Sequence, residues 1–239
     1  MRTVNVIFKE CFEIFSKHML DEMGEPVACN LHEAFGNISE TSHNCLGCNF
    51  ADSINLILRY LRRNNELDDI QHDVSTYIFL LYLFVERIDM VFRIIKLPDI
   101  DKENDYFVFR QIRRWANFIK HPKSFILTHH PEFDFENSDK IYDKKFSQII
   151  NDEFVFNYYK GYSNNNIQRE KNEELYNLLR NSQDVIVIFP DLEILTYNFC
   201  CSFNKFIDLV KNNRDYNDIL NNLATIRSYF ENEFTTIIE

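Results

Sequence analysis

The chain has 239 residues, of which 45% are hydrophobic and 26% charged, and its formal net charge is −11. This composition excludes a disordered chain and leaves enough apolar surface for a packed core. The acidic balance argues against a protein that coats nucleic acid over its whole surface, but it allows a local basic site. The longest apolar run, Tyr77 to Val85, is too short to cross a bilayer. The opening residues lack a signal-peptide pattern, so we expect a cytoplasmic protein that does not enter a membrane.

Apolar residues at helical spacing predict amphipathic helices along most of the chain. The predicted helices cover residues 3–22, 51–65, 67–96, 106–121, 171–182, 191–213 and 216–233. Asp68 or Asp69 is the expected N-cap of the third helix, because a carboxylate can accept from the free N–H groups of the first turn. Pro98 is expected to close that helix, and the acidic stretch 99–105 is expected to be a loop.

The pattern changes after Pro122, where short β-branched and aromatic runs replace the helical spacing. Val185–Phe189 predicts a strand, while Ser124–Thr128 and Glu153–Tyr159 are weaker strand candidates. The predicted fold is therefore mainly α, a helical bundle within a single domain 1–239, with core helices in 51–122 and C-terminal helices in 191–239. A small β-sheet is expected within a mixed α/β insertion at 123–190.

Residues 24–49 form a predicted loop that is rich in potential metal ligands. Two chelating pairs in it have the two-residue spacing that lets both side chains reach one ion: Cys29, His32, Cys45 and Cys48. Thiolate and imidazole suit tetrahedral Zn²⁺, and His43 could replace His32. Four protein ligands leave no open position, so such a zinc ion would be structural. The alternative is a set of thiols that bind no metal.

The most informative segment is residues 107–131, which contain no Asp or Glu but five Lys or Arg and three His. At about 100° per residue, Arg110, Arg114, Asn117 and His121 share one narrow stripe of the predicted helix. The residues on the opposite side are Val108, Ile112, Trp115 and Ile119. Further basic side chains lie along the stripe or beyond it: Arg113, Lys120 and Lys123.

This set of side chains suits phosphate chemistry. Arginine binds phosphate in a bidentate fashion, and histidine moves protons near neutral pH. A histidine could activate a ribose 2′-OH or protonate the leaving oxygen while arginine charge stabilises the phosphorane. The stripe therefore predicts metal-independent RNA cleavage. His129 and His130 are expected to be turn residues or extra contacts to phosphate or base.

The segment from Arg114 to His121 resembles the loose R-x4-6-H motif of HEPN domains, at the six-residue limit of its spacing, near the end of a bundle helix. The resemblance covers about residues 51–125. It implies a HEPN-like endoribonuclease that acts on RNA as a homodimer with a composite site, and a role as a toxin or phage-defence effector. It assigns Arg114 and His121 as the catalytic pair, with Asn117 in support and Arg110, Arg113, Lys120 and Lys123 as substrate contacts. The family often has a polar residue directly after the arginine, where this chain has Trp115.

Other interpretations of the same residues remain open. One is a non-catalytic helical sensor or scaffold that partners a separate enzyme from a defence or toxin–antitoxin operon. Another is a binder of a phosphate-containing small molecule at the same stripe. A third is a basic surface stripe in which His121 merely ends the helix. The chain carries no glycine-rich phosphate loop, and Cys200 and Cys201 are expected to be core thiols.

Overall fold

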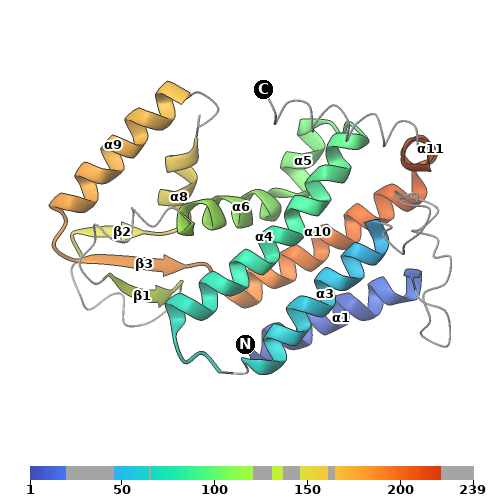
Figure 1. Ribbon diagram of the computed structural model, residues 1–239, viewed down its shortest axis with the longest axis horizontal. Helices are drawn as coiled ribbons and strands as arrows, with labels where there is room; N and C mark the ends of the chain where they lie inside the picture. The colour runs from blue at the N-terminus through green and yellow to red at the C-terminus, as the bar shows by residue number, and fades with distance from the viewer. Residues whose placement is uncertain (20–45, 65, 121–130, 137–145, 161–164, 222–239) are drawn as a thin grey trace, which may run out of the picture.

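The computed structural model describes residues 1–19, 46–64, 66–120, 131–136, 146–160 and 165–221. A bundle of long helices occupies one side of the molecule, and a small sheet with two helices adjoins it (Figure 1). The bundle helices are α1 (Arg2–Met19), α3 (Leu46–Arg63), α4 (Ile70–Ile94), α5 (Asp99–Asp105), α6 (Phe107–Ile119), α10 (Leu192–Asn212) and α11 (Arg214–Asn221). The sheet region holds β1 (Glu132–Phe135), β2 (Gln148–Ile150), α8 (Asp152–Tyr159), α9 (Asn165–Asn181) and β3 (Val185–Phe189).

Helix α4 runs through the bundle beside α10, and its two ends have clear local causes (Figure 1). Asp69 is its N-cap, and the Asp69 side chain accepts from the backbone N–H of His72 at 2.9 Å. At the other end Lys96 takes a positive φ of 53°, and the N–H of Leu97 returns to the carbonyl of Phe92. A left-handed residue after the last turn ends a helix by giving its free carbonyls new donors.

Aromatic side chains fill the centre of the bundle. Phe84 of α4 lies 5.3 Å from Phe199 and 4.9 Å from Phe203 between ring centroids, and both partners belong to α10. Phe8 of α1 stacks on Phe199, while Phe50 of α3 approaches Phe84. These five rings are almost completely buried. One aromatic cluster therefore joins the four longest helices of the bundle.

The sheet is parallel, with β3 in the centre of the strand order β1-β3-β2. Every residue of β3 is buried, as is typical of a central parallel strand covered on both faces. Phe135 of β1 is paired in register with Phe189, and Ile150 of β2 with Val187. The carboxyl ends of all three strands therefore meet at one edge. From this edge the chain continues into α8 after β2 and into α10 after β3.

Several sequence-based expectations are confirmed by this fold. The protein is mainly helical with a small inserted sheet, and Val185–Phe189 forms a strand with those bounds. Asp69, one of the two expected caps, caps α4. Among the helices in the described ranges, none is long and apolar enough to cross a membrane.

Other expectations about local structure were wrong. Glu153–Tyr159 forms helix α8 instead of a strand, because Asn151 caps its first turn by accepting from the N–H of Phe154. The acidic stretch 99–105 is helix α5, with Asp99 and Asp101 in the first turn, where the helix dipole favours negative charge. Helix α3 begins at Leu46, inside the predicted cysteine loop. The strand expected at Ser124–Thr128 lies outside the described residues.

The aromatic cluster predicts a large difference between neighbouring positions of α4. Phe84→Ala should lower the free energy of unfolding by about 3–5 kcal/mol, because it removes a ring that packs against three others. Leu83, the next residue, is 54% exposed, and Leu83→Ala should cost less than about 1 kcal/mol. Urea denaturation of the two variants measures this difference, and equal losses would contradict the described core.

Candidate functional site

Helix α6 carries the predicted site residues and packs against α4 and α8. Its buried side includes Val108, Ile112 and Trp115, which confirms the predicted orientation of the apolar face. Arg110, Arg114 and Asn117 are half-buried on the other side, and the helix ends at Ile119. The remaining predicted site residues of this region lie outside the described residues: His121, Lys123, His129 and His130.

A carboxylate from the start of α8 fixes α6 against the sheet region. One oxygen of Asp152 accepts from the indole N–H of Trp115, and the other accepts from the amide of Gln111 at 2.9 Å. The Trp115 ring also lies 5.5 Å from the ring of Phe189, at the carboxyl end of β3. These contacts fix the orientation of α6 about its own axis, and this orientation determines where its arginine side chains lie.

Arg113 is engaged by two acidic side chains of α4. Its Nε lies 3.0 Å from Glu86 Oε1, and a terminal nitrogen lies 3.3 Å from Asp89 Oδ2. Asp89 also pairs with Arg93 on its own helix at 2.8 Å. The network ties α6 to α4, so we assign Arg113 a structural role.

Arg110 is paired with the neighbouring short helix. A terminal nitrogen of its guanidinium lies 2.9 Å from Glu103 Oε1 of α5, and the group sits 5.2 Å from the centre of the Phe107 ring. Its Nε atom is buried without a hydrogen-bond partner in the part of the chain that the structure describes. Residues 107–131 contain no acidic side chain of their own, and the carboxylates that pair with Arg110 and Arg113 come from α5 and α4.

Arg114 has a different environment from both. Its guanidinium carbon lies 3.8 Å from the centre of the Phe156 ring of α8, the geometry of a cation–π contact. Within the described ranges no carboxylate forms an ion pair with it, although Asp152 and Glu153 line the same pocket. Both oxygens of Asp152 accept hydrogen bonds from Trp115 and Gln111. Partial burial, followed by the positive charge of Arg110, lowers the pKa of Arg114.

A pocket of about 330 Å³ opens between α6 and α8 beside this arginine. We call it the α6–α8 pocket, and its lining residues are Phe107, Gln111, Arg114, Trp115, Asp152, Glu153, Val155 and Phe156. Phe107 is 46% exposed, so an aromatic edge is available next to the guanidinium. The pocket thus combines one cation, two carboxylates and aromatic walls in a volume suited to a small group.

The carboxyl edge of the sheet brings three acids close to this pocket. Glu136 follows β1, Asp152 follows β2, and Asp191 follows β3 and caps α10 by accepting from the N–H groups of Glu193 and Ile194. Partial burial, with smaller contributions from Asp152 and Asp191, raises the pKa of Glu136. This edge of the sheet therefore carries negative charge, while Arg114 of the adjacent helix α6 carries positive charge.

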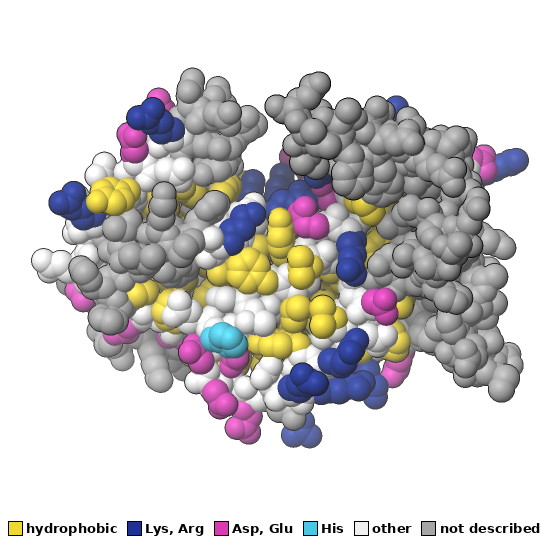
Figure 2. Space-filling model, in the orientation of Figure 1, with side chains coloured by type: hydrophobic (Ala, Val, Ile, Leu, Met, Phe, Trp, Pro, Cys, Tyr) yellow, Lys and Arg dark blue, Asp and Glu magenta, His cyan; other side chains and the backbone are white. Residues whose placement is uncertain are grey.

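Charged side chains of both signs are interspersed on the face seen in Figure 2, and the densest group of Lys and Arg lies in the lower part of this view, over α3, whose last turn carries Arg62 and Arg63. Hydrophobic side chains occupy the middle of this face, in the region of α4 (Figure 2). Lys120 ends α6 with its Nζ 5.5 Å from the Tyr82 ring of α4. On this face the described Lys and Arg side chains are therefore distributed over several helices.

The predicted zinc site is not tested by the structure. Cys29, His32, His43 and Cys45 lie outside the described residues, as does the side chain of Cys48. Elsewhere in the described ranges no group of three or more His, Cys, Asp or Glu side chains could hold a metal ion. Of the two cysteines expected in the core, Cys200 is buried but Cys201 is exposed, because adjacent residues on a helix face different directions.

Sequence reasoning missed the partners that shape this site, namely Gln111, Glu136, Asp152, Phe156 and Asp191. A weak signal for three of them exists, because an acid follows each strand within two residues. In a parallel sheet such positions gather at one edge. The signal was missed because β1 and β2 were not predicted as strands.

No protein-family model matches the chain, and comparisons with curated proteins and with solved structures find no similar protein.

The contact between α6 and α8 can be tested through the only tryptophan of the chain, Trp115. Asp152→Ala leaves the indole N–H and the Gln111 amide without their acceptor, so the free energy of unfolding should fall by about 2 kcal/mol. The emission of Trp115 should change in the same variant. Glu153→Ala removes the adjacent exposed carboxylate of the same helical turn and should lower the free energy of unfolding by less than about 1 kcal/mol; equal effects of the two variants would refute the role of Asp152.

The raised pKa of Glu136 predicts a pH-dependent effect on stability. The folded state holds this proton more tightly than the unfolded chain, so ionisation of Glu136 lowers stability as the pH rises above the ordinary value of 4.5. Glu136→Gln should therefore raise the urea midpoint at pH 7 and leave it unchanged at pH 3. Glu170→Gln, on the exposed side of α9, is the matched control and should show no such pH-dependent gain.

Proposed function

We propose that the protein binds single-stranded RNA through Arg114 and cleaves it as a HEPN-like, metal-independent endoribonuclease. The observation that carries the proposal is that the three arginines of α6 differ in their ion pairing. Arg110 and Arg113 are paired with carboxylates, whereas Arg114 lines an open pocket and has no such partner among the described residues. A phosphate is the anion that an arginine fork matches best in RNA.

The guanidinium of Arg114 is the group in this pocket that would bind an anion, although Asp152 and Glu153 also line it. The Phe156 ring lies against one face of the guanidinium and thereby restricts its orientation, while no residue in the described ranges accepts a hydrogen bond from the N–H groups at its edge. The lowered pKa of Arg114 means that its charge is less well stabilised here than in water. A phosphodiester would supply the missing negative charge.

The aromatic wall supports RNA as the source of that phosphate. The exposed Phe107 ring lies 6.4 Å from the Phe156 ring, beside the arginine. Unpaired bases stack on such rings, and single-stranded RNA is recognised largely in this way. A short single-stranded segment could place one phosphate at Arg114 and a base at Phe107.

His121 is the proposed proton-transfer group of the cleavage step. It would accept a proton from the ribose 2′-OH or donate one to the leaving 5′-oxygen, while Arg114 stabilises the phosphorane. Asn117, half-buried on the same side of α6, is the proposed supporting contact. The resemblance to HEPN domains further implies that two copies pair to form a composite site, and that the activity serves as a toxin or in phage defence.

A second candidate function is a non-catalytic sensor or scaffold that acts with a partner protein. The ion pairs of Arg110 and Arg113 favour it, because they give two cations of the stripe a structural role. In that case Arg114 would contribute only its contact with Phe156. Cleavage assays separate the two candidates.

Arg114→Gln should weaken the binding of a labelled single-stranded oligoribonucleotide about tenfold or more, because a charge-assisted phosphate contact is lost. Arg113→Gln is the matched control on the same helix and should weaken binding less than about threefold. His121→Ala should retain binding and lose cleavage in the presence of EDTA. Fluorescence polarisation and gel-based cleavage measure the two effects.

Equal binding by the Arg113→Gln and Arg114→Gln variants would remove Arg114 from the site. Full cleavage by His121→Ala would reject the catalytic role of that histidine. Absence of cleavage by the wild type together with tight binding would favour the scaffold function. Thermal denaturation of each variant establishes that a loss of function does not come from unfolding.

A further inference from the structure

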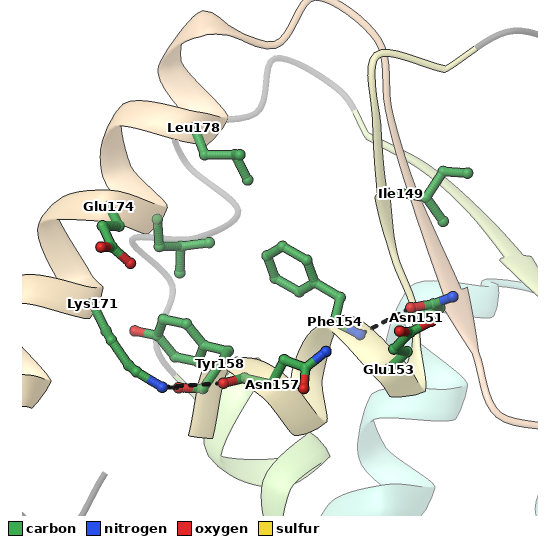
Figure 3. A pocket seen from close by; sticks show the side chains of 10 residues that line it. Ile149, Asn151, Glu153, Phe154, Asn157, Tyr158, Lys171, Glu174 and Leu178 are labelled. Atoms are coloured by element: carbon green, nitrogen blue, oxygen red, sulfur yellow. Dashed lines mark hydrogen bonds between the residues drawn. The ribbon is translucent and has the colours of Figure 1, made fainter. Parts of the chain in front are cut away.

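A second and larger cavity, of about 530 Å³, lies between β2, α8 and α9 (Figure 3). We call it the α8–α9 cavity, and its lining residues are Ile149, Asn151, Glu153, Phe154, Asn157, Tyr158, Lys171, Glu174, Leu175 and Leu178. Figure 3 shows Phe154 and Leu178 extending toward one another across it. Its volume is within the range of cavities that hold small organic molecules.

The lysine in this cavity is already fully engaged. Lys171 Nζ donates to the backbone carbonyls of Asn157 at 3.1 Å and Tyr158 at 3.0 Å, and also to that of Lys160. An ammonium group has three N–H donors, and all three are directed at the C-terminal end of α8. Negative charge at a helix C-terminus favours this arrangement. Lys171 therefore joins α9 to α8 and is not available to hold an anionic ligand.

Two other polar groups of the wall are engaged in the same way. The hydroxyl of Tyr158 donates to the side-chain oxygen of Asn172, and the side-chain oxygen of Asn151 accepts from the N–H of Phe154. Both contacts serve the packing of α8. Their use leaves the cavity with few polar groups for a ligand.

The charged groups that remain are the carboxylates of Glu153 and Glu174. Glu153 lies in the first turn of α8 and Glu174 in the middle of α9, and both are exposed. Figure 3 shows them at opposite ends of the apolar wall that includes Phe154. Neither forms an ion pair with a Lys, Arg or His side chain within the described ranges. As far as the structure describes it, the cavity therefore combines aromatic and aliphatic walls with two carboxylates that form no ion pair.

We propose that the α8–α9 cavity binds an organic cation, a protonated amine carried on an apolar or aromatic body. The body would lie against Phe154, Leu175 and Leu178, and the ammonium group would approach Glu174 or Glu153. Ammonium groups are also attracted by aromatic faces, which Phe154 and Tyr158 supply. An anionic ligand is disfavoured, because the only lysine of the wall is engaged. This cavity lies on the α9 side of α8, whereas the RNA site is proposed at Arg114 on the α6 side, and Glu153 lines both.

The test uses three probes with the same apolar body and different charge: 2-phenylethylamine, 2-phenylethanol and 3-phenylpropanoate. Isothermal calorimetry on the full chain at pH 7 and low salt should show that the amine binds at least about fivefold more tightly than the alcohol. The carboxylate should not bind. Raising the NaCl concentration should weaken binding of the amine and leave that of the alcohol unchanged.

Substitutions locate the site. Glu174→Gln should weaken amine binding about threefold, and the double variant Glu153→Gln with Glu174→Gln should reduce it to the level of the alcohol. Glu170→Gln removes the same charge from α9 away from the cavity and should leave amine binding unchanged. Arg114→Gln should also leave it unchanged, which separates this site from the proposed RNA site.

Three results would overturn the proposal. They are equal affinity for the amine and the alcohol, wild-type affinity in the double variant, and no binding of the amine at millimolar concentration. If the wild-type protein binds the amine but does not cleave RNA, the result counts against the proposed function alone.

Discussion

The position of α6 depends on one carboxylate, that of Asp152. Its two oxygens take the indole N–H of Trp115 and the amide of Gln111, so that a polar contact holds a largely apolar helix against the sheet region. A buried indole without an acceptor would be costly, and this makes the contact specific for one rotation of α6. All the cationic side chains of the candidate site take their directions from that rotation.

Three arginines close together on one helix consequently have different physical environments. Arg113 joins α6 to α4 through two carboxylates, and Arg110 joins it to α5 through Glu103. Arg114 alone of the three packs against an aromatic ring of α8 beside an open pocket. Helix α8 has a second cavity on its α9 side, where Lys171 is used to hold the two helices together. The same short helix thus lies between the pocket proposed to receive a phosphate at Arg114 and the cavity proposed to bind an organic cation, and Glu153 lines both.

Sequence patterns predicted the elements whose signals are local and long. Trp115 and Ile112 revealed the buried face of α6 by their spacing, and Val185–Phe189 was evident as a strand because all five residues are apolar. Strand β1, with the sequence Glu-Phe-Asp-Phe, and the three-residue β2 were too short and too polar to be recognised. Helix α8 was mistaken for a strand because its aromatic residues favour β-structure, a preference that the cap and tertiary packing outweigh. The carboxylates that pair with Arg113 belong to a different helix, α4. The sequence around Arg113 therefore could not predict them.

In the proposed function, Arg114 is the side chain of α6 that receives a phosphate. The most direct test follows the arginine Nε–H resonances of ¹⁵N-labelled protein by NMR during titration with uridine 3′-monophosphate. We expect a saturable shift of the Arg114 resonance, while those of Arg110 and Arg113 stay close to their starting positions. A shift of Arg113 with Arg114 unchanged, or binding of the nucleotide that moves none of the three, would contradict it.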